Sequence, residues 1–500
     1  MNSRRTRAPA VLCAGLSFAL FSGAGFSARA EVPTAVISSP PAVAAMQAAA
    51  PTGFVDLKGH GFTEKEFFIE GTARKYAPSG KWDSDGAWAT TVAGQEKYKT
   101  RMIVRAPSPQ KFNGTVIVEW LNVSRGYDAD STFAVLWPEI LDGGYAWVGV
   151  SAQSMGIDAL KAEKSFGVGQ APIGSKARYG TLQSGSSDGF SYDIFSQTGK
   201  AVRDQAKTLL GGLQPKRVIA VGTSQSAMRL VTFINAVQPN DNVFQGFLLQ
   251  ARNRAGAPID NVIGGASTDV PGPSRIRTDL KVPVLTIISE KDVSGYAAAR
   301  QPDSALFRDW EVAGSAHAPH FRNIYNYVQV GLPMDVKRCD LPENDMPIHY
   351  IMASGISSFA KWIDEGKAPA SLPKIDVKLG TGTEPGVVQR DQYGNGLGGI
   401  RLSQLTVPIA RSHPDNSSTE PSAKLVCGLA GTTQYWTNDA KAAAGEGNWP
   451  QPSLKALYPT HEAYVAAVTK ATRETVTAGF VLERDAKATI DDAMKSNIGK

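Results

Sequence analysis

Short apolar runs alternate with stretches of helical periodicity along most of this chain. Six runs are nearly continuous in Val, Ile, Leu, Trp and Ala, which is typical of strands covered on both faces. They span residues 114–122, 145–152, 217–223, 246–251, 282–289 and 310–314. Two earlier runs, 66–76 and 98–106, alternate apolar and polar positions, and we expect them to be antiparallel edge strands.

Helical periodicity separates these runs at residues 133–141, 191–210 and 225–237. Strand and helix units in alternation predict an α/β fold. We expect a mostly parallel, doubly wound sheet of eight strands with helices on both faces.

The pattern changes after residue 335. Residues 346–365 have the periodicity of a helix that ends at Gly366, and residues 463–496 predict one or two amphipathic helices. The intervening segment is rich in Gly, Asn and Thr and suggests strands and loops. We therefore predict a core over 53–335 and a C-terminal extension over 336–500 that packs on it.

Residues 1–30 have the pattern of a secretory signal peptide. The start is basic, residues 10–26 are apolar, and small residues at 28–30 offer a cleavage site. The apolar stretch is too short for a stable membrane span, so we expect a periplasmic or secreted protein. An arginine at position 7, where a twin-arginine signal has an apolar residue, favours the general secretory route. Residues 31–52, rich in Ala, Pro and Ser, are predicted to form a loose leader.

The 500-residue chain carries a formal net charge of +6. The predicted signal peptide holds four arginines and no acid, so without it the net charge is +2. The basic character therefore belongs mostly to targeting, and we expect neither nucleic acid nor an anionic membrane as a partner.

Two cysteines follow the predicted signal peptide, Cys339 and Cys427. In an oxidising compartment such a pair most simply forms one disulfide, and two buried free thiols are the alternative. Neither cysteine has a second ligand at metal-binding spacing, so we expect no metal and no cofactor.

The run 217–223 leads into the segment Gly222-Thr223-Ser224-Gln225-Ser226, and a helical pattern begins at once. A strand, a tight turn and a helix hold a serine nucleophile with its hydroxyl exposed, and the usual pattern there is Gly-x-Ser-x-Gly. Ser226 stands at the last glycine position. Ser224 is the candidate nucleophile.

A serine hydrolase of this kind places an acid and then a histidine after later strands. The strand predicted at 282–289 is followed by Glu290 and Asp292. Asp292 is the candidate acid that orients the histidine, with Glu290 as the alternative. The run 310–314 leads to His317, the candidate general base. Of the six histidines, only His317 and His320 follow a strand beyond the acid, and His320 is the weaker choice because it lies one helical turn further on.

An oxyanion intermediate needs two backbone N–H donors. The residue after the nucleophile, Gln225, supplies one. The second is expected from the loop after the strand at 114–122, from Asn122 or Val123. Asn122 has an alternative role in which its side chain fixes this loop.

Several segments carry a resemblance to a known family. They are Val118-Glu119-Trp120-Leu121-Asn122-Val123, Ala220 to Ser226, Trp310 to His317, Trp362 to Gly366 with Pro369, Gly394-Asn395, Gly398-Gly399-Ile400-Arg401, Cys427 to Gly431, and Leu457-Tyr458-Pro459. The chain resembles the bacterial secreted α/β-hydrolase-domain family, a branch of the α/β-hydrolase superfamily. The resemblance implies the α/β-hydrolase fold and acyl hydrolysis by a Ser-acid-His triad, and it names no substrate.

The residues and the resemblance together predict a serine carboxylic-ester hydrolase. Its substrate is a small-molecule or polymer ester or a lactone, cleaved through an acyl-enzyme. An acyltransferase or amidase with the same triad, and a non-catalytic binding protein on a hydrolase scaffold, are the alternatives. The sequence leaves the oligomeric state open.

Overall fold

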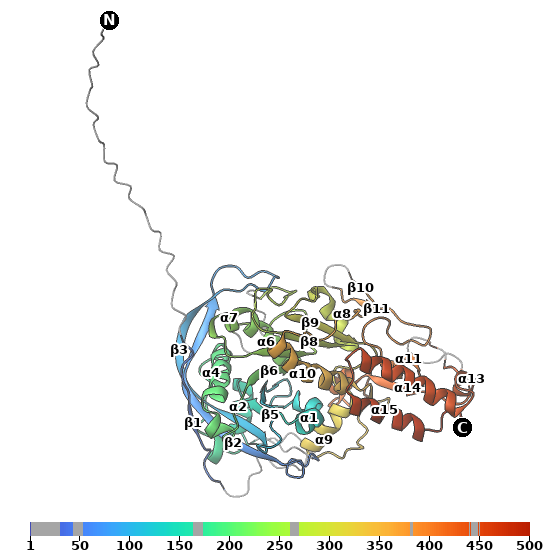
Figure 1. The fold of residues 1–500 in the computed structure, drawn as a ribbon. Helices are drawn as coiled ribbons and strands as arrows, with labels where there is room; N and C mark the ends of the chain where they lie inside the picture. Colours follow the sequence, from blue (N-terminus) through green and yellow to red (C-terminus); the bar gives the residue numbers. More distant parts are fainter. Residues whose placement is uncertain are drawn as a thin grey trace.

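The structure is a computed structural model that describes residues 1, 31–43, 54–163, 174–260, 270–380, 384–439, 441, 449 and 451–500. The predicted signal peptide, apart from Met1, lies outside the described residues. A large sheet runs through the molecule from β2 and β3 on one side, and the helices α14 and α15 lie at the opposite end with the C-terminus (Figure 1).

Nine strands form this sheet, in the order β1-β2-β3-β5-β4-β6-β7-β8-β9. Their bounds are β1 (Val36–Ser38), β2 (Phe62–Pro78), β3 (Thr90–Pro107), β4 (Thr115–Trp120), β5 (Ala146–Val150), β6 (Arg217–Thr223), β7 (Gly246–Gln250), β8 (Val284–Ser289) and β9 (Phe307–Val312). The last six in spatial order run parallel, whereas β1, β2 and β3 pair antiparallel at one edge.

The predicted mostly parallel α/β sheet is confirmed, and all eight predicted runs form strands. The count of eight was one too low. The additional strand, β1, comes from the segment predicted to be a loose leader, where Val36 pairs with Glu70 of β2. Three residues are too few to show a strand pattern in sequence, and only the pairing with β2 makes them one.

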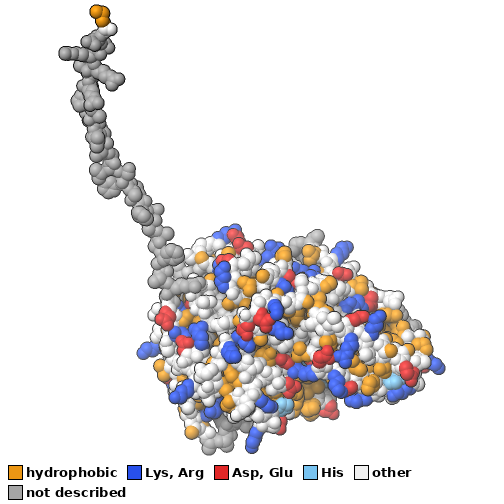
Figure 2. Space-filling view, viewed as in Figure 1, with side chains coloured by type: hydrophobic (Ala, Val, Ile, Leu, Met, Phe, Trp, Pro, Cys, Tyr) orange, Lys and Arg blue, Asp and Glu red, His pale blue; other side chains and the backbone are white. Residues whose placement is uncertain are grey.

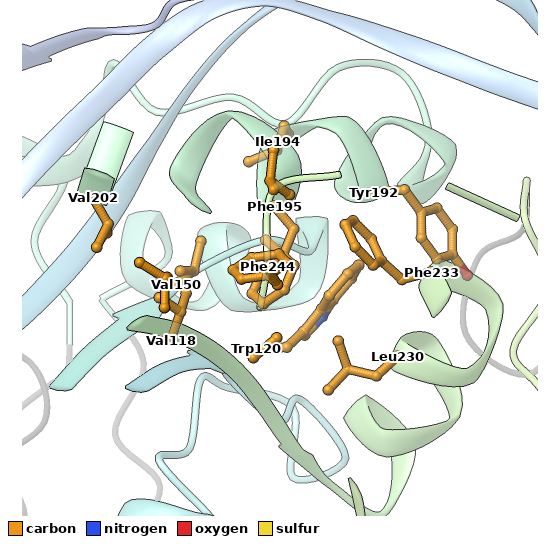
Figure 3. Close-up of a cluster of buried hydrophobic side chains, with 14 of the residues drawn as sticks. Val118, Trp120, Val150, Tyr192, Ile194, Phe195, Val202, Leu230, Phe233 and Phe244 are labelled. Carbon is orange, nitrogen blue, oxygen red and sulfur yellow. The ribbon is translucent and has the colours of Figure 1, made fainter. Parts of the chain in front are cut away.

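Alternate residues of the central strands face two separate hydrophobic clusters. On one face, Val116, Val118 and Trp120 of β4 pack against helices from the middle of the chain. These helices are α4 (Ser191–Asp204), α5 (Ala206–Leu209), α6 (Gln225–Thr232) and the π-helical turn η2 (Phe233–Val237), which α7 (Gln238–Asp241) follows. Figure 3 shows this packing, with the Trp120 ring among Phe195, Phe233 and Phe244.

The opposite face of the sheet presents Ile117, Ile219 and Ile287 to a second cluster. The helices here are α1 (Phe133–Asp142), α8 (Glu290–Tyr296), α9 (His320–Gln329) and α10 (Ile348–Glu365). Shorter connecting helices are α2 (Ser154–Lys161), α3 (Lys176–Tyr179), η1 (Asp188–Phe190) and η3 (Ala297–Ala299). Full burial on both faces explains why the parallel strands read as continuous apolar runs.

The C-terminal part packs on the sheet through α10, which ends at Gly366 in a left-handed conformation (φ 70°). The elements beyond it are β10 (Val377–Lys378), β11 (Val387–Val388), α11 (Ser403–Thr406), β12 (Ala410–His413), α12 (Lys424–Ala430), β13 (Thr432–Tyr435), α13 (Leu454–Leu457), α14 (His461–Thr477) and α15 (Glu483–Lys495). A backbone bridge from Ile400 to Val312 continues the sheet beyond β9. A disulfide joins Cys339 to Cys427.

Basic and acidic side chains are interspersed on the face shown in Figure 2. Within the described residues, no helix is both long and apolar enough to cross a bilayer.

Candidate active site

Ser224 lies on a sharp turn between β6 and α6. Its backbone has φ 60° and ψ −119°, a positive φ that a non-glycine residue rarely adopts. The Ser224 N–H donates to the Gln250 carbonyl of the neighbouring strand at 2.9 Å, which helps to hold this conformation. Strain of this kind persists only where the surroundings impose it, and it is typical of functional turns.

The elbow accommodates Ser226 at the position where a glycine is usual. The Ser226 hydroxyl donates to the Thr223 carbonyl at 2.9 Å and accepts from the Thr223 N–H at 3.2 Å. Close approach is instead enforced at Gly222, where an added Cβ would lie 3.0 Å from the Ser226 backbone. The small residue is therefore needed before the nucleophile, and a serine fits after it.

Asp292 and His317 are in direct contact. The Asp292 Oδ1 and His317 Nδ1 atoms are 2.7 Å apart, and both residues are largely buried. Asp292 lies in the first turn of α8, directly after β8, and the Ser289 hydroxyl donates to its second oxygen. His317 follows β9 after a turn through Gly314 (φ 72°). An aspartate in this position fixes the tautomer of the imidazole and leaves Nε2 free for proton transfer.

The alternative acid and the alternative base have other partners. Glu290 is buried, and its carboxylate accepts from Arg390 at 2.8 Å and from the Gly314 N–H at 2.6 Å. Burial raises the pKa of Glu290. His320 is half-exposed and lies 3.4 Å from Glu343, which raises the pKa of the imidazole. Neither residue takes part in the Asp292–His317 pair.

Ser224 and His317 lie at the same edge of the sheet, because the carboxyl ends of parallel strands meet there. A chain of buried contacts links them. The Thr223 and Thr132 hydroxyls are 3.0 Å apart. Next to Thr132, Ser131 accepts from Arg322, which also donates to the His317 carbonyl at 3.3 Å.

The Ser224 hydroxyl and His317 Nε2 form no hydrogen bond within the described part of the chain. Such bonds are often long in a free enzyme and tighten when substrate binds.

Asn122 fixes the loop after β4 to the nucleophile turn. Its side-chain amide donates to the Thr223 carbonyl at 2.8 Å and accepts from the Ser124 N–H at 2.9 Å. The Asn122 backbone N–H already donates to the Ala129 carbonyl at 2.9 Å. The expectation that Asn122 donates this N–H to an oxyanion is therefore wrong, because the group is occupied. The alternative role, in which the side chain fixes the loop, agrees with these contacts.

The N–H groups of Val123 and Gln225 have no acceptor among the described residues. Val123 is fully buried, so an unpaired N–H there is costly unless a ligand accepts from it. These are the two donors that remain for an oxyanion.

Sequence reasoning missed Glu119, a buried acid on β4. Its carboxylate accepts from the N–H groups of Thr132 and Phe133, at 2.6 and 2.9 Å, and from the Trp147 indole at 3.0 Å. Burial raises the pKa of Glu119 to about 8, and the charge of Asp130 contributes. Glu119 thus holds the start of α1 and the loop beside Thr223. The available signal was an acidic residue inside an otherwise apolar run.

A serine elbow on a mostly parallel sheet, with an acid–histidine pair after two later strands, defines the α/β-hydrolase class of proteins. The chain belongs to the alpha/beta hydrolase domain family, whose model matches residues 30–491. No curated protein matches the sequence.

Three hydrolases are among the solved structures that the chain matches. One is the methylesterase BT1017, with 13% identity, 59% of this chain and 57% of that chain covered, and a TM-score of 0.28. A second is XC6422 from Xanthomonas campestris, a serine hydrolase without lid, with 12% identity, 51% and 92% covered, and a TM-score of 0.26. A third is a thermostable esterase from Pseudomonas putida ECU1011, with 12% identity, 51% and 74% covered, and a TM-score of 0.26.

Proposed function

We propose that this chain is a serine hydrolase that cleaves a carboxylic ester or lactone. Family membership supports the hydrolase class. The main support for the proposal is the contact between Asp292 and His317, which lie at the same edge of the sheet as the strained Ser224. The substrate is a small-molecule or polymer ester.

In the proposed reaction, the Ser224 hydroxyl attacks the ester carbonyl while His317 Nε2 takes its proton. Asp292 stabilises the imidazolium that forms. The N–H groups of Val123 and Gln225 donate to the oxyanion of the tetrahedral intermediate. His317 then gives the proton to the leaving alkoxide, and water, activated by the same histidine, releases the acid from Ser224.

The test combines active-site labelling with three variants. A fluorophosphonate should label Ser224 in the folded protein, and Ser224→Ala should lose both the label and p-nitrophenyl butyrate cleavage. His317→Ala should lower kcat by at least about 10³-fold, as loss of a triad base does elsewhere. His320→Ala is the matched control and should keep its activity. Labelling that survives the Ser224→Ala substitution refutes the choice of nucleophile. An equal loss of kcat in His317→Ala and His320→Ala refutes the choice of base.

We also propose that the protein is exported to the periplasm or beyond. The signal-peptide pattern of residues 1–30 supports export, and the Cys339–Cys427 disulfide suits an oxidising compartment. Cell fractionation of a tagged chain tests this, and a cytoplasmic, uncleaved product refutes it.

A further inference from the structure

A pocket of about 540 Å³ is lined by two segments that continue from residues of the candidate active site. One wall is the loop after β4, through Arg125 and Tyr127, and a second is α9, through Asn326 and Tyr327. This loop also carries Val123, and α9 begins three residues after His317. Two residues of chain span at most about 7 Å, so Arg125 lies close to the proposed oxyanion donor Val123.

The pocket combines an apolar lining with hydrogen-bond donors that lack acceptors. Arg125 has no hydrogen-bond or ion-pair partner among the described residues. The Asn326 side chain is 2% exposed, and its Nδ2 has no acceptor within the same part of the chain. An amide N–H buried in this way is costly unless a ligand accepts from it.

A second arginine adds to the positive charge near this pocket. Arg322 is 5% exposed, and its Nε has no partner among the described residues. Burial and, after it, the nearby charge of Arg125 lower the pKa of Arg322 to about 10. The single acidic residue among those that line the pocket, Glu420, is exposed and lies 3.8 Å from Arg338. The two like charges repel each other, and an anion between them relieves this repulsion.

The remaining wall is apolar and covalently anchored. Val330, Leu332, Val336 and Val426 contribute aliphatic surface. Val426 precedes Cys427, and the segment of Val336 runs on to Cys339, so the disulfide holds these two parts of the wall together. A fixed apolar wall opposite unpaired donors fits a ligand with a hydrocarbon body and one anionic group.

We propose that this pocket binds a free carboxylate of the substrate, so that the preferred ester carries one carboxylate besides the scissile ester group. Arg125 and the Asn326 amide receive the carboxylate oxygens, and the aliphatic wall receives the carbon chain. This inference rests on the proposed ester hydrolysis at Ser224.

The experiment compares mono-p-nitrophenyl glutarate with p-nitrophenyl valerate, which differ mainly in a terminal carboxylate. The wild-type protein should prefer the glutarate ester in kcat/KM by about 10- to 100-fold, the range of a charge-assisted hydrogen-bond pair. Arg125→Gln and Asn326→Asp should each lower this preference about tenfold or more, mainly through KM. Arg125→Lys should restore part of it, and Arg203→Gln, on an exposed arginine of α4, is the control that should leave both rates unchanged.

The carboxylate site is overturned if wild type cleaves the two esters at equal rates. It is also overturned if Arg125→Gln and Asn326→Asp both leave the preference for the glutarate ester intact. Inhibition by inorganic phosphate stronger than that by hexanoate overturns it as well. If neither ester is cleaved, the proposed hydrolysis fails instead. The pocket is then tested separately by calorimetric titration of hexanoate into Ser224→Ala, where binding weakened by Arg125→Gln supports the site and absence of binding overturns it.

Discussion

Asn122 provides the sharpest test of how the active-site edge is assembled. Its amide joins the loop that carries Val123 to the turn that carries Gln225, the two proposed oxyanion donors. Asn122→Ala removes two neutral hydrogen bonds, one buried and one part-buried, each worth about 1 kcal/mol net. The Thr223 carbonyl keeps its bond from Ser226, and the exposed Ser124 N–H can reach water. We therefore expect a stability loss of only about 1–2 kcal/mol.

The expected loss of activity is larger than this stability change implies. Removing one oxyanion donor outright lowers kcat by about 10²–10³-fold in a serine protease. Displacing Val123 relative to Gln225 should remove part of that effect, so we expect kcat to fall about 10- to 100-fold while KM changes little. Asn122→Asp keeps the acceptor for Ser124 but sets a carboxylate against the Thr223 carbonyl, and it should be at least as harmful.

Asn235→Ala is the matched control for this experiment. Asn235 is also fully buried, donates to the Arg275 carbonyl at 2.7 Å and accepts from the Arg277 N–H at 3.1 Å, but it lies in η2. Urea unfolding should show similar losses of stability for Asn122→Ala and Asn235→Ala. Steady-state kinetics on p-nitrophenyl butyrate should show a fall in kcat for Asn122→Ala only. If kcat falls equally in both variants, or in neither, the role given to Asn122 is refuted.

Three further predictions concern stability. Because the pKa of Glu119 is raised, its contribution to the free energy of unfolding is full below about pH 4.5 and is lost as pH rises through about 8, by at most about 1.4 kcal/mol per pH unit. In urea titrations, wild type should therefore lose more stability than Glu119→Gln between pH 5 and 8. Parallel curves of stability against pH for the two proteins would contradict this. Ser226→Ala should cost about 1–2 kcal/mol through its two bonds to Thr223, and an unchanged unfolding midpoint would show that the elbow does not depend on them. Replacing Cys339 and Cys427 by Ser should cost about 2–4 kcal/mol, and a reductant should destabilise wild type but not this variant.

Local sequence signals predicted the strands because burial on both faces selects apolar residues along the whole strand. They also predicted the helix end at Gly366, where a left-handed residue is required. They failed for β1, whose three residues become a strand only by pairing with β2. They also predicted one continuous helix over residues 225–237, whereas α6 ends at Thr232 and Phe233–Val237 form the π-helical turn η2.

In the candidate site, too, the sequence predicted some features and the structure decided others. Ser224, Asp292 and His317 were predicted because each follows a strand, and parallel strands bring their carboxyl ends to one edge. The choice of Asp292 over Glu290 was left open by the sequence, since both follow β8 within three residues. The structure separates them, because the helical turn at α8 directs one carboxylate to His317 and the other to Arg390 and Gly314.

The sequence by itself determined the order of strands and helices, the family and the serine elbow. These depend on local periodicity and on residues close together in the chain. Tertiary structure alone decided that the Asn122 N–H is occupied, that Glu119 holds the start of α1, and that Arg125, Asn326 and Val426 surround one pocket. Each depends on groups brought together by packing from separate elements, and such contacts leave no periodic trace in the sequence.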